Sequence, residues 1–326
     1  MKPIPLLTPG PPPPWAANTP NPFHADLYAM YSSLYRGITT DPQWMIVPID
    51  DHLVHRGDGV FETLKACHRR IFLLEPHLDR LIQSAASIHL PPPVNRNDLI
   101  HIVLQTVRAA RRDHALIRIL LSRGPGSMGI SPADCPQPAL YVIVHRLPPP
   151  FMDTHPHGAT AGWSTIPVKS GHFATIKTCN YLPNALMKHE ALHRQLDFIF
   201  ARDEQNHLAE GPTENVAIVD ADRRLLLPRP GRILPGTTLR RSLELAQSLL
   251  NHHTLTACLE ADITSHALQT AREILIFGTT ANVTAVTRFE GQPVGDGQPG
   301  PVYHALSRLL LQDLHDPSSP SLTPVP

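Results

Sequence analysis

The chain has no excess of charge and few cysteines. Its 326 residues carry 28 lysines and arginines against 28 aspartates and glutamates, so the formal net charge is zero. Nucleic-acid-binding proteins normally carry a basic excess or a basic stripe, and this balance therefore predicts no nucleic-acid partner. The four cysteines, Cys67, Cys135, Cys179 and Cys258, are scattered without a CxxC pair. That pattern argues against a disulfide scaffold or a cysteine-based zinc site and predicts a reduced, cytoplasmic setting.

Long apolar runs, a targeting signal and lysine are also scarce. No segment approaches the roughly 20 apolar residues that a membrane-spanning helix needs, so no membrane partner is expected. The first 15 residues are mixed and proline-rich, which is not the pattern of a signal peptide. Only five lysines occur, Lys2, Lys65, Lys169, Lys177 and Lys188, so chemistry that needs an amine nucleophile has five candidates.

Prolines mark out the organisation of the chain. Proline-rich stretches at 1–22 and 316–326 predict disordered ends, and the proline triplet within 148–152 predicts an interdomain linker. Residues 23–147 are predicted to form a small N-terminal domain and residues 153–315 a larger C-terminal domain. Strands and helices mix without a regular βαβ period, which indicates an α/β (α+β) fold of two lobes. A site between the lobes is the default expectation.

Apolar periodicity gives the individual elements. Helices are predicted over 75–90, 97–111, 181–195, 238–250 and 302–314. Strands are predicted over 45–49, 60–66, 71–74, 115–122, 139–146, 172–177, 197–201, 217–220, 254–259 and 274–277.

Two short motifs match well-known signatures, and the first of them lacks its structural context. Gly124, Gly126 and Gly129 fit GxGxxG after a predicted strand. A dinucleotide site needs a helix to open at the third glycine, and Pro132 and Pro136 oppose a helix there. We therefore predict a glycine-rich loop between two strands.

The second motif is HExxH, formed by His189, Glu190 and His193 in a predicted helix. Two histidines four residues apart share a helix face and could chelate zinc, with the glutamate as base. No third ligand follows in the pattern of the zinc peptidases. A zinc hydrolase is therefore only a distant alternative, no metal is predicted, and the simpler interpretation is a solvated helix face.

A third set of residues is chemically coherent. Lys177 lies in a mostly apolar segment before a predicted helix, where desolvation makes an amine a better nucleophile, although a lysine pointing to solvent is the competing interpretation. Glu210 lies in a turn rich in backbone donors, and Gly-Thr-Thr corners at 236–238 and 278–280 suit a phosphate. An amine, a carboxylate for a pyridine nitrogen and phosphate-binding corners are what pyridoxal phosphate needs.

Six segments in order carry a resemblance to a known family. They are 55–63 (HRGDGVFET), 75–85 (EPHLDRLIQSA), 176–191 (around Lys177), 210–215 (EGPTEN), 234–240 (LPGTTLR) and 278–280 (GTT). Over residues 45–312 the chain resembles the class IV, fold-type IV aminotransferases, which depend on pyridoxal phosphate. That family includes branched-chain aminotransferases, D-amino-acid aminotransferases and aminodeoxychorismate lyases.

The resemblance implies a role for each matched residue. Lys177 would form the Schiff base and act as general base, and Glu210 would face the pyridine nitrogen. Tyr181 would contact the cofactor ring oxygen, unless it is only a packing residue at the helix start. The phosphate ligands implied by the match are Arg80, Thr237, Thr238 and Thr279. Without the match, Arg80 would be taken for an exposed helix arginine.

Substrate choice is less sharply indicated. The loop 122–132 lacks the Arg-x-His carboxylate trap of the D-alanine-type enzymes, and its SMGISP portion is similar to the GMGVNP loop of branched-chain enzymes. Its Ser-Arg-Gly portion resembles the lyases. Phe61 is a candidate pocket wall or a core aromatic, Arg123 could pair a substrate carboxylate or lie in solvent, and Thr280 would line the carboxylate pocket.

The resemblance therefore implies an aminotransferase that acts on an amino acid and a 2-oxo acid, with a branched-chain-like preference. A D-amino-acid aminotransferase or an aminodeoxychorismate lyase of the same family is the alternative. The family usually builds its site at a dimer interface, so the resemblance also implies a homodimer.

Overall fold

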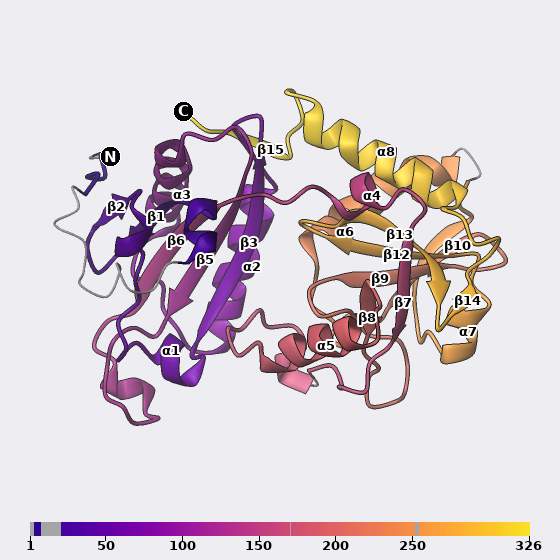
Figure 1. The fold of residues 1–326 in the computed structure, drawn as a ribbon, viewed down its shortest axis with the longest axis horizontal. Coiled ribbons are helices and arrows are strands. Elements are labelled where there is room, and N and C mark those ends of the chain that lie inside the picture. The colour runs from indigo at the N-terminus through magenta and orange to yellow at the C-terminus, as the bar shows by residue number, and fades with distance from the viewer. Residues whose placement is uncertain (1–2, 8–20, 170, 252–253) are drawn as a thin grey trace. The chain divides into compact units, whose positions relative to one another are not determined.

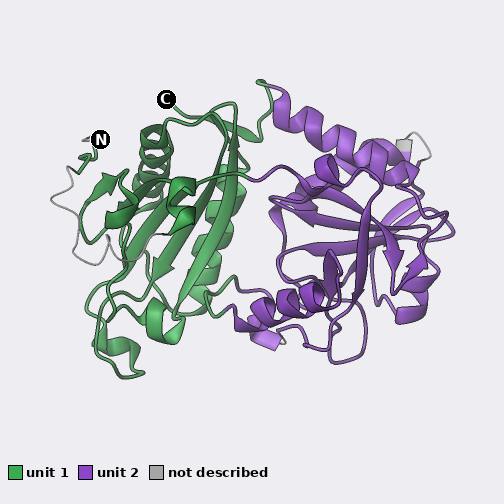
Figure 2. Cartoon of the chain, viewed as in Figure 1, with its two compact units in different colours: residues 1–147, 177–180, 317–326 green, residues 148–176, 181–316 purple. Residues whose placement is uncertain are grey.

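The structure is a computed structural model, and it describes residues 3–7, 21–169, 171–251 and 254–326. These residues form two compact units (Figure 2). Unit 1 takes in residues 1–147, 177–180 and 317–326, and unit 2 takes in residues 148–176 and 181–316. The first boundary falls at the proline triplet. Unit 1 also takes in residues 177–180 and 317–326, which the sequence assigned to the C-terminal domain and to the tail.

Unit 1 is built on a seven-stranded antiparallel sheet in the order β15-β4-β3-β5-β6-β1-β2 (Figure 1). The strands are β1 (Leu27–Ser32), β2 (Gly37–Thr39), β3 (Gly59–Cys67), β4 (Arg70–Phe72), β5 (Ala115–Ser122), β6 (Ala139–His145) and β15 (Leu322–Pro324). The helices are α1 (His52–Arg56), α2 (Leu74–Ser87) and α3 (Arg96–Ala110), with short 3-10 turns η1 (Pro22–Asp26), η2 (Pro42–Trp44) and η3 (Pro132–Asp134).

Helix α2 shows why these residues form this unit. Leu74, Leu78, Leu81 and Ala85 recur at the three-and-four spacing of a helix face, and each is at most 1% exposed. That face packs against β3, while α3 packs against β1 and β6. The helices therefore bury the apolar side of the sheet and fix the position of β3, the strand that carries part of the candidate site.

Unit 2 is built on a mixed eight-stranded sheet in the order β11-β10-β9-β12-β13-β7-β8, with β14 paired to β13. The strands are β7 (Ala159–Trp163), β8 (Phe198–Phe200), β9 (Asn215–Val219), β10 (Arg224–Pro228), β11 (Ala257–Ala261), β12 (Glu273–Gly278), β13 (Asn282–Phe289) and β14 (Gln292–Pro293). The helices are α4 (Phe151–Thr154), α5 (Leu182–His193), α6 (Thr237–Asn251), α7 (Ser265–Gln269) and α8 (Pro301–His315), with a 3-10 turn η4 (Gly171–Phe173). Phe200, Ile218, Ile274 and Ile276 are fully buried in its core.

The C-terminal segment differs from its prediction. Residues 316–326 were expected to be disordered, but 322–324 form β15 and pair antiparallel with β4. Leu73 N–H donates to Ser321 O at 2.7 Å, and Val325 is only 9% exposed. The prediction was wrong because short β4 leaves an edge open, and even a proline-containing segment can pair there.

The other proline-rich end is only partly described. Residues 1–2 and 8–20 of the predicted disordered start lie outside the described residues. Residues 3–7 do have a place, since Leu7 N–H donates to Ile38 O at 2.7 Å. A strand predicted over 45–49 is absent from the described residues, where the chain runs irregularly after η2.

Candidate active site

The candidate site residues divide between the two units. Lys177, Arg80, Phe61 and Arg123 belong to unit 1. Glu210, Tyr181 and the two Gly-Thr-Thr corners belong to unit 2.

The segment that carries Lys177 extends the sheet of unit 1. Phe61 N–H donates to Lys177 O at 2.9 Å, and Cys179 N–H donates to Gly59 O at 2.8 Å. On this side of β3, β4 pairs only with Ala66 and Cys67. The amino-terminal half of that edge is therefore free for 177–179, which explains why a segment flanked by unit 2 residues packs within unit 1.

The side chain of Lys177 is held in a nearly closed environment. The residue is 8% exposed, and its Nζ lies 4.5 Å from the centroid of the Phe61 ring. Its backbone N–H donates to Ser84 Oγ at 3.3 Å. The interpretation of Lys177 as a solvent-pointing lysine is therefore wrong, and Phe61 walls the space around its amine.

Behind Lys177 lies a buried charge network that the sequence reasoning missed. Glu62, on β3, accepts hydrogen bonds from Arg80 Nε at 2.7 Å, from Arg80 Nη2 at 2.8 Å and from His77 Nδ1 at 2.7 Å. Burial on its own would raise the pKa of Glu62, but the charge and hydrogen bonds of Arg80, with those of His77, lower it to about 2. Burial lowers the pKa of His77. Glu62 is therefore ionised throughout the neutral range.

The network changes the interpretation of Arg80. It is 8% exposed rather than an exposed helix arginine, and Glu62 fixes one edge of its guanidinium group. Lys177 adds to the electrostatic field that lowers the pKa of His77, so the two cations belong to one cluster. A sequence signal existed: a glutamate on a buried strand, with a histidine and an arginine three residues apart on the next helix. A phosphate contact of Arg80 stays a prediction.

In unit 2, Glu210 is held by the backbone of the first Gly-Thr-Thr corner. Leu234 N–H donates to Glu210 Oε2 at 2.9 Å. Asn215 Nδ2 donates to Leu234 O at 2.9 Å and lies 3.4 Å from Glu210 Oε2. The carboxylate therefore has a fixed orientation at the start of β9.

The first corner has the shape of an anion cradle. A Cβ at Gly236 would lie 1.8 Å from Asn215 Oδ1, so only glycine allows the backbone to approach here. Thr237 and Thr238 are 7% and 5% exposed and open α6, a 15-residue helix. The first N–H groups of a helix have no partner within it and attract anions. Close backbone approach, hydroxyls and helix N–H groups fit a phosphate.

The second corner is brought to the same edge of the sheet by strand pairing. Phe277 on β12 is the register partner of Asn215 on β9, and Gly278 follows it directly. A Cβ at Gly278 would lie 3.7 Å from Glu214 Cγ, an ordinary contact. Thr279 and Thr280 form the half-buried turn between β12 and β13 rather than a helix start. The two corners share a sequence but not a conformation.

Tyr181 stands at the start of α5, where it is the N-cap residue. The Nζ of Lys169 lies 4.9 Å from the centroid of its ring, which is a cation–π distance. Its predicted cofactor contact stays a prediction.

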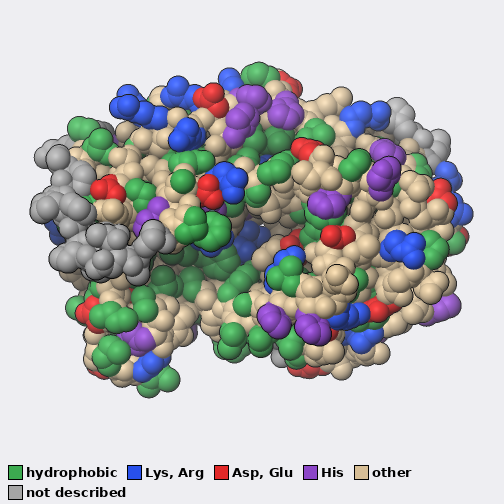
Figure 3. Space-filling view, viewed as in Figure 1, with side chains coloured by type: hydrophobic (Ala, Val, Ile, Leu, Met, Phe, Trp, Pro, Cys, Tyr) green, Lys and Arg blue, Asp and Glu red, His purple; other side chains and the backbone are tan. Residues whose placement is uncertain are grey.

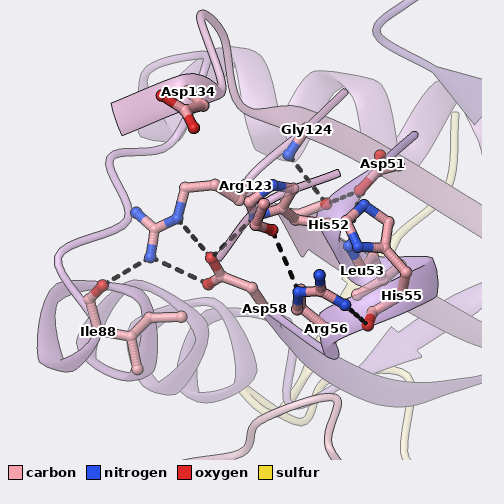
Figure 4. Close-up of polar contacts among 12 residues, drawn as sticks. Asp51, His52, Leu53, His55, Arg56, Asp58, Ile88, Arg123, Gly124 and Asp134 are labelled. Atoms are coloured by element: carbon pink, nitrogen blue, oxygen red, sulfur yellow. Dashed lines mark hydrogen bonds and ion pairs between the residues drawn. The ribbon is translucent and has the colours of Figure 1, made fainter. Parts of the chain in front are cut away.

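Arg123 has a structural role that the sequence did not predict (Figure 4). Its Nε and Nη2 donate to the two oxygens of Asp58 at 3.0 Å each. Nη2 also donates to Ile88 O, and Nη1 to His89 O, both at 2.8 Å. The side chain is 12% exposed. Arg123 therefore ties the end of α2 to the loop before β3 and is not a solvent-exposed arginine, while its contact with a substrate carboxylate stays a prediction.

The same loop bears on the GxGxxG motif. Residues 124–131 form irregular chain before η3, as predicted, and no helix opens at Gly129. His52 N–H donates to Gly124 O at 3.1 Å, and Arg56 Nη2 donates to Met128 O at 2.6 Å. The loop therefore packs along α1.

Glu190 of the HExxH motif has a clear structural function. It accepts from Ser164 Oγ at 2.9 Å and from Thr165 N at 3.0 Å, and it pairs with Arg194 at 3.3 Å. The described parts of the chain contain no group of three or more His, Cys, Asp or Glu side chains placed to hold a metal ion. Hydrogen bonding and charge pairing account for Glu190 without a metal. No helix among the described residues is long and apolar enough to cross a membrane.

Sequence comparison supplies independent information. The sequence model of the amino-transferase class IV family matches residues 59–289. The chloroplastic D-amino-acid transaminase of Arabidopsis thaliana is 37% identical over 289 residues, which are 88% of this chain and 76% of that protein. A Methanocaldococcus jannaschii protein, named provisionally as a branched-chain-amino-acid aminotransferase, is 31% identical over 256 residues, or 78% of this chain and 87% of that one.

Structural comparison gives the same fold. The branched-chain aminotransferase of Thermoproteus uzoniensis, solved with norvaline, superposes with a TM-score of 0.81. The match covers 92% of this chain and 100% of that one at 22% identity. A branched-chain amino acid aminotransferase solved with pyridoxamine 5′-phosphate superposes with a TM-score of 0.84, over 92% of this chain and 99% of that one at 23% identity.

Proposed function

The chain belongs to the class IV aminotransferases, enzymes that use pyridoxal phosphate, and on that premise we propose that it transfers the amino group of a D-amino acid to a 2-oxo acid. The observation that carries the choice is the 37% identity with a D-amino-acid transaminase over 88% of the chain. The provisional branched-chain relative shares less, 31% over 78%.

The residues present in each unit fit the cofactor, and we propose a role for each of them in holding it. Lys177 would hold it covalently, while Thr237, Thr238, the first N–H groups of α6 and Thr279 would hold its phosphate. The carboxylate of Glu210, fixed by Leu234, would lie against its pyridine nitrogen. When bound, the cofactor supplies an electron sink that stabilises negative charge at the substrate Cα.

The protein's own part of the chemistry is proton handling and positioning. The amine of Lys177 would take the proton from the substrate Cα, a step that needs a base held close and shielded from water. The 8% exposure of Lys177 and the Phe61 ring beside its Nζ support that assignment. In unit 1, Arg80, whose guanidinium group Glu62 holds in a fixed orientation, would be a further phosphate ligand.

Phe61 and Thr280 remain the proposed substrate contacts. Arg123 ranks behind them, because Asp58 and two backbone carbonyls already accept hydrogen bonds from its guanidinium group. A branched-chain L-amino acid is the second candidate substrate, since the loop segment SMGISP is similar to that of the branched-chain enzymes.

A paired substrate panel tests the proposal. The holoenzyme is incubated with the D- and L-enantiomers of alanine, leucine and glutamate, with 2-oxo acids as acceptors, and the new amino acid is measured by chiral chromatography. Faster turnover of the D-enantiomers supports the proposal, and faster turnover of L-leucine supports the second candidate. Pyruvate released from aminodeoxychorismate, without transfer from any amino acid, would overturn both in favour of the lyase.

We further propose that the enzyme is a homodimer. Around α1 in unit 1, four large apolar residues are exposed: Ile49 at 75%, Val54 at 49%, Met128 at 61% and Ile130 at 84%. The packing of loop 124–130 along α1 places them on neighbouring segments. Exposed apolar groups of this kind mark protein contacts. Light scattering should give twice the chain mass, and Ile130→Asp should reduce it to the mass of one chain.

We also propose a reducing compartment, with the cytoplasm as the first expectation. All four cysteines are free thiols in the structure. One relative carries the name of a chloroplastic enzyme, so a plastid is the alternative to test. Cell fractionation with an antibody to the protein separates the two.

A further inference from the structure

A second cluster of charge lies in unit 1, at the opposite end of β3 from Lys177. A cavity of about 140 Å³ opens beside the β3–β4 turn, the carboxyl end of α3 and the C-terminal segment. Its lining residues are Arg69, Arg108, Arg111, Arg112, Val107, Asp113 and Val325. Figure 3 shows basic side chains gathered on the part of unit 1 where Figure 1 places α3 and β15. We call this cavity the arginine pocket.

Backbone hydrogen bonds fix the segments around the arginine pocket. Arg69 N–H donates to Asp113 O at 2.9 Å, and Arg69 O accepts from Val325 N at 2.9 Å. Arg111 ends α3, where its N–H donates to Arg108 O at 3.2 Å. The arginines therefore start from set positions on separate elements rather than from one loose loop.

The backbone is unusual at the residues that carry these charges. His68 and Arg69 form the two-residue turn between β3 and β4 with φ values of 49° and 56°, and Arg111 has a φ of 51°. Left-handed turn positions favour glycine, asparagine and aspartate, because a Cβ is crowded there. The chain keeps basic residues at positions where local conformation alone would select others. Arg112 is fixed differently, with its guanidinium carbon 4.6 Å from the centroid of the Tyr28 ring.

Four arginines and one carboxylate, that of Asp113, line the arginine pocket, so its side chains carry a positive excess. Among the described residues, none of its four guanidinium groups forms an ion pair with a carboxylate. The four pocket arginines are exposed, whereas the partly exposed side chains of Arg96, Arg194 and Arg241 each pair with two carboxylates. The carboxyl end of α3 attracts cations and accounts for a basic residue in its last turn, but not for the arginine of the β3–β4 turn.

We propose that the arginine pocket binds a small polyanion, one with a phosphoryl group or with two or more carboxylates. Guanidinium groups donate paired hydrogen bonds that match the oxygens of phosphate and carboxylate. Several of them around one cavity select a ligand with more than one negative charge. The volume far exceeds the about 10–15 Å³ that a single water needs, yet it suits a small molecule rather than a polymer.

Calorimetric titration of the holoenzyme tests the proposal, because bound cofactor already fills the other phosphate site. Pyrophosphate and citrate serve as the two probes, and chloride at equal ionic strength controls for screening. Pyrophosphate is expected to bind once per chain. The double variant Arg108→Gln with Arg112→Gln should weaken that binding at least about tenfold, since charge-assisted hydrogen bonds are lost.

Matched variants keep the experiment decisive. Arg272→Gln with Arg288→Gln removes the same charge from exposed positions of unit 2 and should leave affinity unchanged. The double variant Arg108→Lys with Arg112→Lys keeps both positive charges but loses the paired hydrogen bonds of the guanidinium groups. Its affinity for pyrophosphate should lie between those of the parent and of the glutamine double variant. Cofactor absorbance and thermal denaturation verify folding of each protein.

The outcomes separate the possible ligands. Binding of citrate but not pyrophosphate supports the pocket with carboxylate chemistry, and the reverse supports it with phosphoryl chemistry. Binding of neither probe, or equal weakening by the unit 2 variants, overturns the proposal. So does binding of an RNA oligonucleotide that depends on Arg108 and Arg112 while neither small anion binds.

Discussion

The two groups of site residues are held in place by opposite means. In unit 1, Glu62, His77 and Arg80 are buried side chains that hold one another behind Lys177. In unit 2, Glu210 is held by the backbone of Leu234, next to a glycine that leaves no room for a side chain. One group depends on charge and the other on shape.

This difference has a physical consequence. A buried charge network is stable only while each partner keeps its charge, because an unpaired buried charge is costly. A corner held by backbone groups carries no net charge, and it requires a glycine because no space is left for a side chain. Adding a side-chain atom there should therefore disrupt it. Unit 1 should therefore respond to charge removal and to pH, and the corner of unit 2 should respond to a single methyl group.

The largest effect is expected for Lys177→Ala, which removes the amine that would hold the cofactor and take the substrate proton. Turnover should fall at least about a thousandfold, and the near-visible absorbance of the bound cofactor should disappear. Lys188→Ala is the matched control, because Lys188 is exposed on α5 and donates to a backbone oxygen, Asp197 O, at 3.3 Å. A Lys177→Ala enzyme that kept both absorbance and turnover would refute the assignment.

Next comes Glu62→Gln, which leaves Arg80 buried without its charged partner. The free energy of unfolding at pH 7 should fall by about 3–5 kcal/mol in denaturant titrations. The pKa of Glu62 is lowered from 4.5 to about 2. Its stabilisation is therefore complete above pH about 4.5 and is lost as pH falls toward 2, so the curves of parent and variant should converge in acid.

The control for that variant is Glu244→Gln, since Glu244 is 51% exposed and pairs with Arg241 on the surface. Its loss should cost less than about 1 kcal/mol. Equal losses of unfolding free energy for the two variants would show that the buried network of unit 1 stabilises the fold no more than a surface ion pair does.

Gly236→Ala probes the shape of the unit 2 corner. Its Cβ would lie 1.8 Å from Asn215 Oδ1, so the asparagine must move and release Leu234 and Glu210. Unfolding free energy should fall by about 1–3 kcal/mol, with weaker cofactor binding by equilibrium dialysis. Gly278→Ala, whose Cβ would have no neighbour nearer than 3.5 Å, should change stability by less than about 0.5 kcal/mol. Equal effects would contradict the distinction between the two corners.

The smallest expected effect has the opposite sign. Burial lowers the pKa of Lys65, on β3, to about 8 from 10.5. Lys65→Met should therefore raise unfolding free energy at pH 7 by about 1–2 kcal/mol, allowing for the lost contact with the Phe72 ring.

The pH dependence of that gain follows from the direction of the shift. The unfolded chain holds the Lys65 proton up to pH about 10.5, while the folded chain releases it near 8. The stability of the parent therefore rises between these values, and the advantage of Lys65→Met should vanish there. If the stability gain of Lys65→Met did not change with pH, it would have to come from packing and not from the charge of Lys65.

Much of the local structure could be predicted from the sequence. Residues 115–122 were predicted as a strand and form β5 with the same bounds. The helix predicted over 75–90 forms α2, with its apolar face buried as expected. Period and propensity act over neighbouring residues, so a sequence window contains the information they need.

Pairing between distant segments could not be predicted. The run 172–177 has strand-like residues, but it begins within η4 and continues as turn and irregular chain, and only its last residue, with 178–179, pairs with β3. Whether an edge is open depends on how far β4 extends along β3, which no local pattern records. The same reason explains the error over the C-terminal segment and β15.

Within the candidate site, sequence by itself determined which chemistry is present: a scarce lysine in an apolar segment, a carboxylate in a donor-rich turn and two Gly-Thr-Thr corners. Only the tertiary structure decided what each group faces. Folding pairs Arg123 with Asp58 and Glu62 with Arg80. It also gives the corner at 236–238 a close backbone approach and places the corner at 278–280 in a hairpin turn. Residue type fixes which bonds a group can make, but desolvation and pairing depend on neighbours that are distant in the chain, and folding alone supplies them.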